Sequence, residues 1–206
     1  MEVNLSKCKK LVHGVGYNDF TRPSKNGKTI TREYDAWSRM LFRCTKDGIK
    51  HCPSYNGCMV STNFLSYTFF YDWCQAQIGF DNKDENNKSW NLDKDLLVKG
   101  NKIYSEDTCV FIPASVNMRL VTCKKTRGDY PVGVCFSSYA KKFCASCNMG
   151  KRKTKYLGYF DDPKQAFLAY KTFKEALIKE VANEYKDRLD PRAYQALINY
   201  EVNIND

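Results

Sequence analysis

Apolar residues recur at helical spacing in two stretches of the first half of the chain. The first stripe is Tyr34, Trp37, Met40, Leu41 and Cys44, and the second, within residues 62–78, is Phe64, Tyr67, Phe70, Tyr71 and Cys74. Residues three and four apart share one face of a helix, so both stretches are predicted to be helices that bury this face. Thr62 is the expected N-cap of the second helix.

Residues 92–118 combine two short apolar runs with a helix signal. Residues 92–98 and 109–112 are predicted as strands joined through a turn at 100–101, and Pro113 is expected to open a helix. The preceding residues 81–89 (DNKDENNKS) are polar and are predicted to be an exposed loop. In this compact unit Asp93 and Asn117 could face each other as oxygen ligands of a metal ion.

The last part of the chain alternates short apolar runs with basic turns. Residues 132–137, 143–148 and 155–160 are predicted as three antiparallel strands, and 123–128 (CKKTRG) as a connector between domains. Asp162 is the expected N-cap of a long helix that starts at Pro163. Its apolar residues keep the spacing needed to lie on the sheet: Ala166, Tyr170, Phe173, Leu177 and Val181. A short helix is expected over 192–200.

Charge is concentrated in one part of the 206 residues. The formal net charge is +10, and residues 119–155 hold ten Lys or Arg against the single acid Asp129. A polyanion partner for this segment, or a surface that only keeps the protein soluble, would explain the excess. The loop-like first residues also carry a basic arm, which either follows a phosphate backbone or is a mobile terminus: Lys7, Lys9, Lys10, Arg22, Lys25 and Lys28.

The ten cysteines are predicted to be reduced thiols. The chain opens MEVNLSKCKK without an apolar signal region, and no apolar run reaches membrane-spanning length, so a cytosolic protein without a membrane partner is expected. Cys144 and Cys147 lie three apart in a predicted strand and should point to opposite faces. Cys44, Cys52 and Cys58, near His51, are either a zinc knuckle or buried small hydrophobes.

Residues 92–118 also carry a family pattern. L-D-K-D at 92–95, G-N at 100–101, Y-S-x-D-x-C-x-F at 104–111 and a following helix with Asn resemble the HNH (ββα-metal) endonucleases of phage genomes, many of them homing enzymes. The resemblance covers roughly residues 34–120. It implies a β-hairpin that holds one Mg²⁺ or Mn²⁺ against a helix, with Asp93 and Asn117 as ligands, and metal-dependent hydrolysis of a phosphodiester in DNA.

Two positions depart from the HNH pattern. Thr108 stands where the family usually has Asn, and Lys94 replaces the His that serves as general base. A lysine with an ordinary pKa of about 10.4 is protonated at neutral pH and cannot accept a proton from water. Lys94 would then grip phosphate in an inactive site, or a water activated by the metal or by Asp95 would still allow slow cleavage, or the alignment is shifted.

A second resemblance covers about residues 129–185. Y-P-x-G-V at 130–134, Y-L-G-Y-F at 156–160, and Ala166 with Ala169 and Tyr170 resemble the ethylene-response-factor (apetala-type) DNA-binding domain. This resemblance implies that the open face of the sheet enters the major groove. The residues expected on that face are Tyr139, Lys141, Lys142, Phe143, Arg152, Lys153 and Lys155. They suit phosphate neutralisation with modest sequence preference, or they only keep an exposed sheet soluble.

The sequence therefore predicts an α+β protein in which a helical frame surrounds a ββα-metal (HNH-like) unit, followed by a three-stranded antiparallel sheet packed on one long helix. The expected divisions are a basic arm (1–33), a nuclease module (34–122) and a DNA-binding module (129–206). The expected function is metal-dependent cleavage or nicking of double-stranded DNA in the cytoplasm of an infected bacterial cell. The alternative is an inactive phage protein that binds DNA or inhibits a host protein.

Overall fold

The structure is a computed structural model that describes residues 11–120, 129–150 and 153–206. Within these residues the fold is mixed α+β, with six α-helices and several small sheets, one of them three-stranded and antiparallel. The chain forms two compact units, the first from Met1–Asn82 and Leu92–Phe111 and the second from Lys83–Asn91 and Ile112–Asp206. The connector expected at 123–128 lies outside the described residues, as do Lys7, Lys9 and Lys10 of the basic arm.

The first unit is built on helices α1 (Arg32–Arg43), α2 (Lys46–His51) and α3 (Tyr67–Gln75). A short hairpin of β1 (Lys25–Asn26) and β2 (Thr29–Ile30) precedes α1. The prediction of Thr62 as the N-cap of the second helix is wrong. Asn63–Leu65 forms a 3₁₀ turn instead, and the Ser66 hydroxyl accepts the amide of Phe69 at 3.2 Å, so α3 begins later.

Aromatic packing holds the first unit together, as the helical stripes predicted. Trp37, Phe64 and Phe70 are fully buried. The indole Nε1 of Trp37 donates to the carbonyl of Phe64 at 2.7 Å, which satisfies the polar atom of a buried ring. The Phe64 ring meets Phe70 and Trp73 edge-on, with centroids 5.0 and 4.8 Å away. These side chains therefore form a core and not a binding platform.

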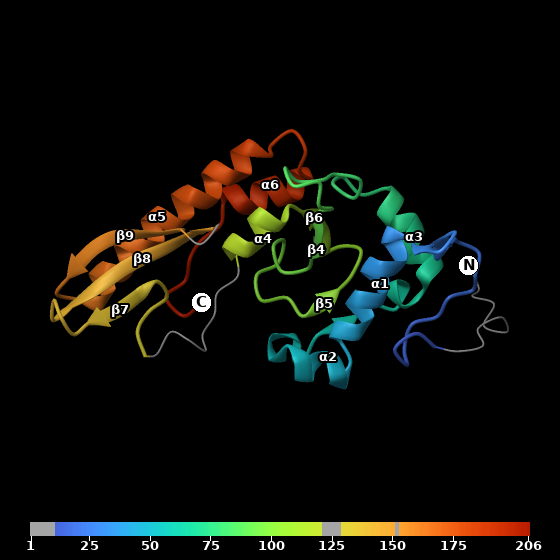
Figure 1. Cartoon of the computed structure of the whole chain (residues 1–206), viewed down its shortest axis with the longest axis horizontal. Coiled ribbons are helices and arrows are strands. Elements are labelled where there is room, and N and C mark those ends of the chain that lie inside the picture. Colours follow the sequence, from blue (N-terminus) through green and yellow to red (C-terminus); the bar gives the residue numbers. More distant parts are fainter. Residues whose placement is uncertain (1–10, 121–128, 151–152) are drawn as a thin grey trace. The chain divides into compact units, whose positions relative to one another are not determined.

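Two pairs of short strands complete this region (Figure 1). β3 (Met59–Val60) pairs in parallel with β5 (Ile103–Tyr104), and β4 (Asn91–Asp93) pairs with β6 (Val110–Ile112). The strand predicted over 92–98 therefore ends at Asp93. The cause is local: the Asp93 Oδ1 atom accepts the amides of Asp95 and Leu96 at 2.9 and 2.8 Å and turns the chain away from β6.

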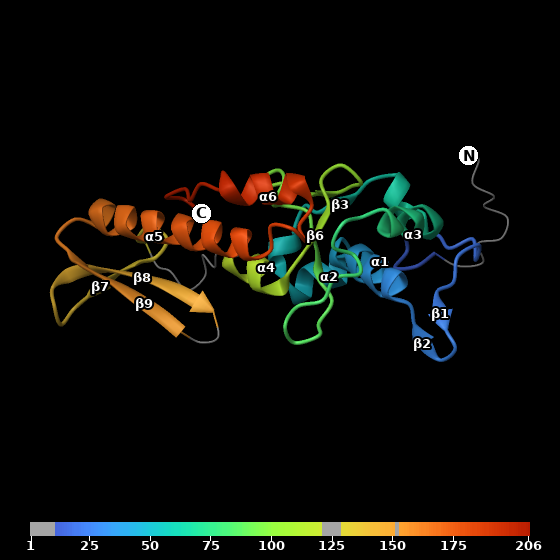
Figure 2. The ribbon, with the colours of Figure 1, turned by 90° about the horizontal axis from the view of Figure 1, so that it is seen from above.

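The second unit has the sheet and the long helix that the sequence predicted. Its strands are β7 (Val134–Ser137), β8 (Lys142–Gly150) and β9 (Lys153–Phe160), and its helices are α4 (Ala114–Leu120), α5 (Pro163–Glu184) and α6 (Pro191–Ile198). The Asp162 carboxylate accepts the Lys164 amide at 3.0 Å, which confirms the N-cap. Figures 1 and 2 show α5 along one face of the sheet with α6 beside it. Gly133, at φ 77°, meets the Tyr170 ring so closely that a Cβ would lie 2.1 Å from it.

The short segment Lys83–Asn91 is part of the second unit although α4 is more than twenty residues further along the chain. The Arg188 guanidinium donates to the Lys83 carbonyl at 2.6 Å and lies 5.3 Å from the Trp90 ring. The Tyr185 hydroxyl donates to the Glu85 carboxylate at 3.3 Å. The polar loop predicted at 81–89 is thus fixed to the C-terminal end of α5. None of the helices in the described residues is long and apolar enough to cross a membrane.

Candidate functional site

Lys94, at the position of the HNH base, is enclosed in the first unit. The residue is only 5% exposed. Its Nζ donates to the Asn101 carbonyl at 2.9 Å and to the Asp95 carboxylate, and it lies 5.6 Å from the centroid of the Tyr104 ring. A second hydrogen bond joins the same two residues, because the Asn101 Nδ2 donates to the Lys94 carbonyl at 2.8 Å. Lys94 therefore closes the loop from residue 94 to residue 101 and has little surface with which to hold a phosphate.

Asp93 lies next to this loop, and its carboxylate already forms hydrogen bonds with the loop backbone. One carboxylate oxygen accepts the two amides that end β4, and the side chain is largely enclosed. Burial raises the pKa of the Asp93 carboxyl above its usual 3.8, and the nearby Asp95 raises it further, against the lowering effect of the two amides and Lys94.

The remaining predicted metal ligand is carried by another part of the fold. Asn117 lies half-buried in the middle of α4, in the second unit, whereas Asp93 belongs to the first. One turn of the first unit gathers Asp93, Lys94 and Asp95, and Asn117 is not part of that turn. Thr108, which replaces a family Asn, donates from its hydroxyl to the Ile103 carbonyl at 3.0 Å and so fixes a turn.

The zinc knuckle, one of the two alternatives for Cys44, Cys52 and Cys58, is not assembled in the part of the chain that the structure describes. Cys58 is buried, the Cys52 sulfur lies 3.1 Å from the Ser54 hydroxyl, and the His51 Nδ1 lies 3.1 Å from the Asp47 carbonyl. Burial raises the pKa of the Cys44 thiol to about 11, which disfavours the thiolate that zinc requires. Among those residues no three His, Cys, Asp or Glu side chains come together as a metal site.

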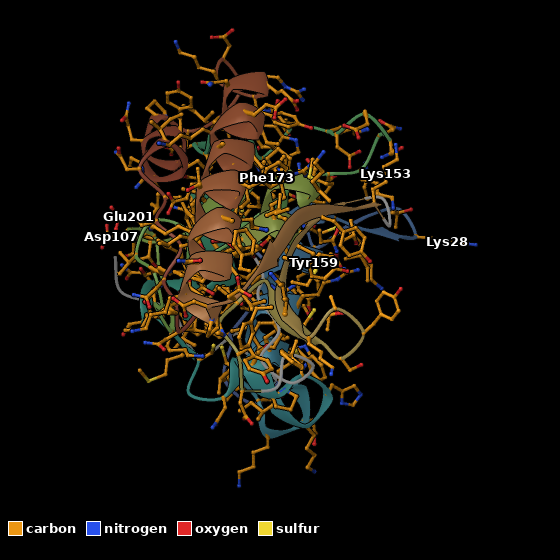
Figure 3. The ribbon with its side chains drawn as sticks, turned by 90° about the vertical axis from the view of Figure 1, so that its left-hand side faces the viewer. Lys28, Asp107, Lys153, Tyr159, Phe173 and Glu201 are labelled. Carbon is orange, nitrogen blue, oxygen red and sulfur yellow. The ribbon has the colours of Figure 1, made fainter. Side chains whose placement is uncertain are left out.

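The residues predicted to face DNA lie in different parts of the sheet. Tyr139 is 98% exposed at the β7–β8 turn, where Lys141 follows with φ 50°. Lys142 is exposed and forms an ion pair with Asp161 at 3.1 Å. Lys153 and Lys155 are exposed on β9. Arg152 lies outside the described residues. Figure 3 shows Lys153 and Tyr159 on the sheet and Phe173 on the helix that covers it.

Strand register divides these residues between the two faces of the sheet. Directly opposed residues share a face, and Phe143 is opposed by Phe136 and Phe160. Val134 and Ala145, two residues along from Phe136 and Phe143, are buried beneath α5, so this is the covered face. Lys155 opposes Cys147, two residues along from Ala145, so it lies on the covered face and not on the open face where it was expected. Phe143, also expected on the open face, lies on the covered one as well. Its ring packs 5.3 and 5.4 Å from those of Tyr130 and Phe136.

The open face presents two tyrosines that the sequence patterns did not assign to it. Tyr159 opposes Cys144 and Tyr156 opposes Ser146, and these side chains are 56% and 72% exposed. Because Tyr156 and Tyr159 are three apart, regular alternation would put them on opposite faces. A bulge in the register between Ala145 and Ser146 brings both to the same face. Cys144 and Cys147, with no extra residue between them, point to opposite faces as predicted.

Comparisons with models of protein families, with curated proteins and with solved structures found no match to this chain. The two family resemblances therefore rest on the residues quoted for them. The function is therefore inferred from the geometry of the two units.

Proposed function

We propose that this chain binds double-stranded DNA through the open face of the β7–β8–β9 sheet and the β7–β8 turn beside it. The observation that carries the proposal is the exposure of Tyr156 and Tyr159 on this face together with exposed Tyr139, Lys141 and Lys142 at or beside the turn. Basic side chains release counterions from phosphates, and tyrosines supply contact area at little cost in side-chain entropy.

The geometry also indicates how selective the binding should be. A β-ribbon fits the major groove, where sequence is read mainly by bidentate Arg, Asn or Gln contacts to base edges. The only arginine in residues 130–160 is Arg152. Affinity should therefore come mainly from phosphates, with a steep salt dependence and a small preference between sequences.

Binding of a fluorescent duplex, titrated at several salt concentrations, tests the proposal. Lys141→Gln with Lys142→Gln should lower the slope of log affinity against log salt by about 2, since each phosphate contact contributes about 0.9. Tyr156→Ala with Tyr159→Ala should weaken binding about tenfold with an unchanged slope, since these side chains add contact area and not charge. The matched control, Lys164→Gln with Lys179→Gln, removes two charges from α5. If the control weakens binding as much as the lysine pair on the turn, the docking face is not this one.

Metal-dependent hydrolysis of DNA is the second candidate function. It is favoured by the order of elements, because the strand pair β4–β6 is followed directly by helix α4, as the HNH resemblance implies. Two observations argue against hydrolysis: Lys94 is enclosed, and the Asp93 carboxylate accepts backbone amides of its own loop. Hydrolysis would need Mg²⁺ or Mn²⁺ as Lewis acid, and the HNH resemblance implies Asp93 and Asn117 as its protein ligands.

A plasmid-nicking assay separates hydrolysis from binding alone. The protein is incubated with supercoiled plasmid and either Mg²⁺ or Mn²⁺, beside the variants Asp93→Ala and Asn117→Ala and the control Asp107→Ala, which removes another acid of the first unit. Nicking that is lost in the first two variants and kept in the control supports an enzyme. Absence of nicking at every metal concentration, with DNA binding retained, rejects hydrolysis and leaves the binding proposal standing.

A further inference from the structure

The second unit contains a cavity of about 940 Å³ that the DNA-binding face does not use. It is bordered by the segment 84–88, by α4, by the β8–β9 hairpin and by α5. Lys174, in the middle of α5, contributes to its wall and is only 6% exposed. Its amine has no hydrogen bond or ion pair to any of the described residues. The Lys174 amine is not one of the buried polar atoms that lack a partner, so it reaches the open space of the cavity.

A second cationic group lines the same cavity. The Arg119 guanidinium donates to the Ser115 carbonyl at 2.7 Å and to the Met149 carbonyl at 3.5 Å, which fixes it between α4 and the end of β8. Its Nε–H is buried without an acceptor in the part of the chain that the structure describes. One cavity thus contains two cationic side chains: Arg119, which two carbonyls hold in place, and Lys174, whose amine keeps all its hydrogen-bonding capacity.

No carboxylate among the described residues forms an ion pair with Lys174. Burial lowers the pKa of its amine, Cys147 raises it and Arg119 lowers it, and no acidic residue contributes. Two cations that repel each other in a buried place are the arrangement expected of a site whose counter-charge comes from a ligand.

The acidic residues of the cavity lie at its other end. Glu184 follows Lys174 by ten residues of α5, which is about 15 Å along the helix. Glu85 accepts from Tyr185 at that end, and Asp84 accepts the amides of Asn86 and Lys88 within its own loop, both at 2.9 Å. Lys88 and Lys153 also line the cavity, so its wall carries charges of both signs. Glu85 and Glu184 lie toward Tyr185 and away from Lys174, and the part beside Lys174 is called the basic end.

We propose that the basic end of this cavity binds the phosphate group of a ligand, held by the Lys174 amine and the Arg119 guanidinium. A phosphate offers the several acceptor oxygens that two fixed cationic donors require. The site is independent of the proposed DNA-binding face, because Lys174 lies beside Cys147 on the side of the sheet that α5 covers. The phosphate can belong to a small molecule or to a nucleic-acid backbone that reaches the cavity.

Calorimetric titration of the whole protein with inorganic phosphate, at constant ionic strength set by chloride, tests the proposal. Saturable binding is expected, and Lys174→Met should weaken it at least about tenfold, the effect of losing one charge-assisted hydrogen bond. Lys179→Met, which removes another lysine from the same helix, should leave it unchanged. The proposal is overturned if the wild-type protein shows no saturable binding, or if Lys174→Met and Lys179→Met bind phosphate equally well.

A measurement on the unaltered protein guards against a variant that does not fold. Limited acetylation with acetic anhydride, read by mass spectrometry, reports the accessibility of each amine. Phosphate at saturating concentration should lower the labelling of Lys174 severalfold and leave Lys179 unaffected. Equal labelling of Lys174 with and without phosphate would contradict a site at this amine.

Two further ligands identify the source of the phosphate. If a mononucleotide competes with inorganic phosphate and Lys174→Met leaves affinity for duplex DNA unchanged, the ligand is a small molecule. If Lys174→Met instead lowers the salt slope of DNA binding by about 1, the cavity receives a backbone phosphate. DNA binding that fails altogether while phosphate binding persists would reject the proposed function and not this site.

Discussion

Among the described residues, each of the two units buries one lysine, and the surroundings of the two amines are opposite in kind. Lys94 is 5% exposed and is surrounded by a carbonyl, a carboxylate and an aromatic ring. Lys174 is 6% exposed and has neither a hydrogen bond nor an ion pair within the described residues. Burial alone therefore says little about a lysine. The groups around its amine determine whether the side chain stabilises a loop or remains available to bind a ligand.

The cationic group that is free to bind an anion therefore lies in the second unit and not in the first, where the sequence placed it. The HNH resemblance directed attention to Lys94, but its positive charge is already balanced inside its own loop. The unbalanced charge is at Lys174 and Arg119, in a helix and sheet that the sequence connected only with DNA docking. The following variants test this contrast, beginning with the largest expected effect.

Lys94→Met should destabilise the first unit by about 3 kcal/mol. It removes the amine that joins Asp95 to Asn101 and leaves the Asn101 carbonyl without its donor. Urea unfolding followed by tryptophan fluorescence measures the effect, since Trp37 and Trp73 lie in this unit. Lys46→Met, at an exposed lysine, is the control and should change stability by less than about 0.5 kcal/mol. Equal effects of the two variants would show that Lys94 is not a structural clasp.

Lys174→Met should have the opposite sign. In phosphate-free buffer it should stabilise the second unit by about 1 kcal/mol, because it replaces an uncompensated buried ammonium with an apolar side chain of similar length. Amide hydrogen exchange in α5 as a function of denaturant measures this local stability. A loss of stability as large as that of Lys94→Met would mean that Lys174 has a structural partner.

The Lys174 amine should make the stability of the second unit depend on pH in the alkaline range. Burial lowers the pKa of Lys174 below its usual 10.5, so between the folded and unfolded pKa values the unfolded chain binds more protons than the folded one. Stability from this group is therefore lowest below the folded pKa and rises as pH increases through that window. Comparison of wild-type protein with Lys174→Met at about pH 7 and about pH 10 should show the wild type gaining relative to the variant. No relative gain would contradict the lowered pKa.

Asp95→Asn should have the smallest effect, a loss of about 0.5 kcal/mol in the first unit. The Asp95 side chain is 55% exposed, so solvent screens its attraction to Lys94, and Lys94 keeps the Asn101 carbonyl and the Tyr104 ring. A double-mutant cycle with Lys94→Met measures the coupling directly. A coupling energy above about 2 kcal/mol would show that the ion pair, and not the carbonyl, closes this loop.

The parts of the fold that follow from local signals were predictable. The stripe around Trp37 and the cap at Asp162 each act over one or two helical turns, and both are present in the structure. The end of β4 at Asp93 was not predicted, since a side chain that accepts two amides overrode the apolar pattern of residues 92–98. The parallel pairing of β3 with β5 joins two-residue strands distant in sequence, and no local signal marks it.

The candidate sites were less predictable than the fold, because they depend on neighbours that are distant in sequence. Nothing next to Lys94 indicates that Tyr104 and Asn101 will enclose it. The position of Lys174 did carry a signal: it follows Tyr170 by four residues and precedes Leu177 by three, so it lies on the apolar face of α5. A lysine within the apolar stripe of a helix therefore marks a position where a ligand could supply the missing counter-charge.

The division of the chain between the units affects how the protein folds during synthesis. The chain passes from one unit to the other after Asn82, Asn91 and Phe111, so Lys83–Asn91 leaves the ribosome long before the helix that it contacts. The hydrogen bonds from Arg188 to Lys83 and from Tyr185 to Glu85 close loops of 105 and 100 residues. Contacts of such separation form late and slow folding. Trp90 can therefore pack against Tyr185 and Arg188 only after α5 has been synthesised.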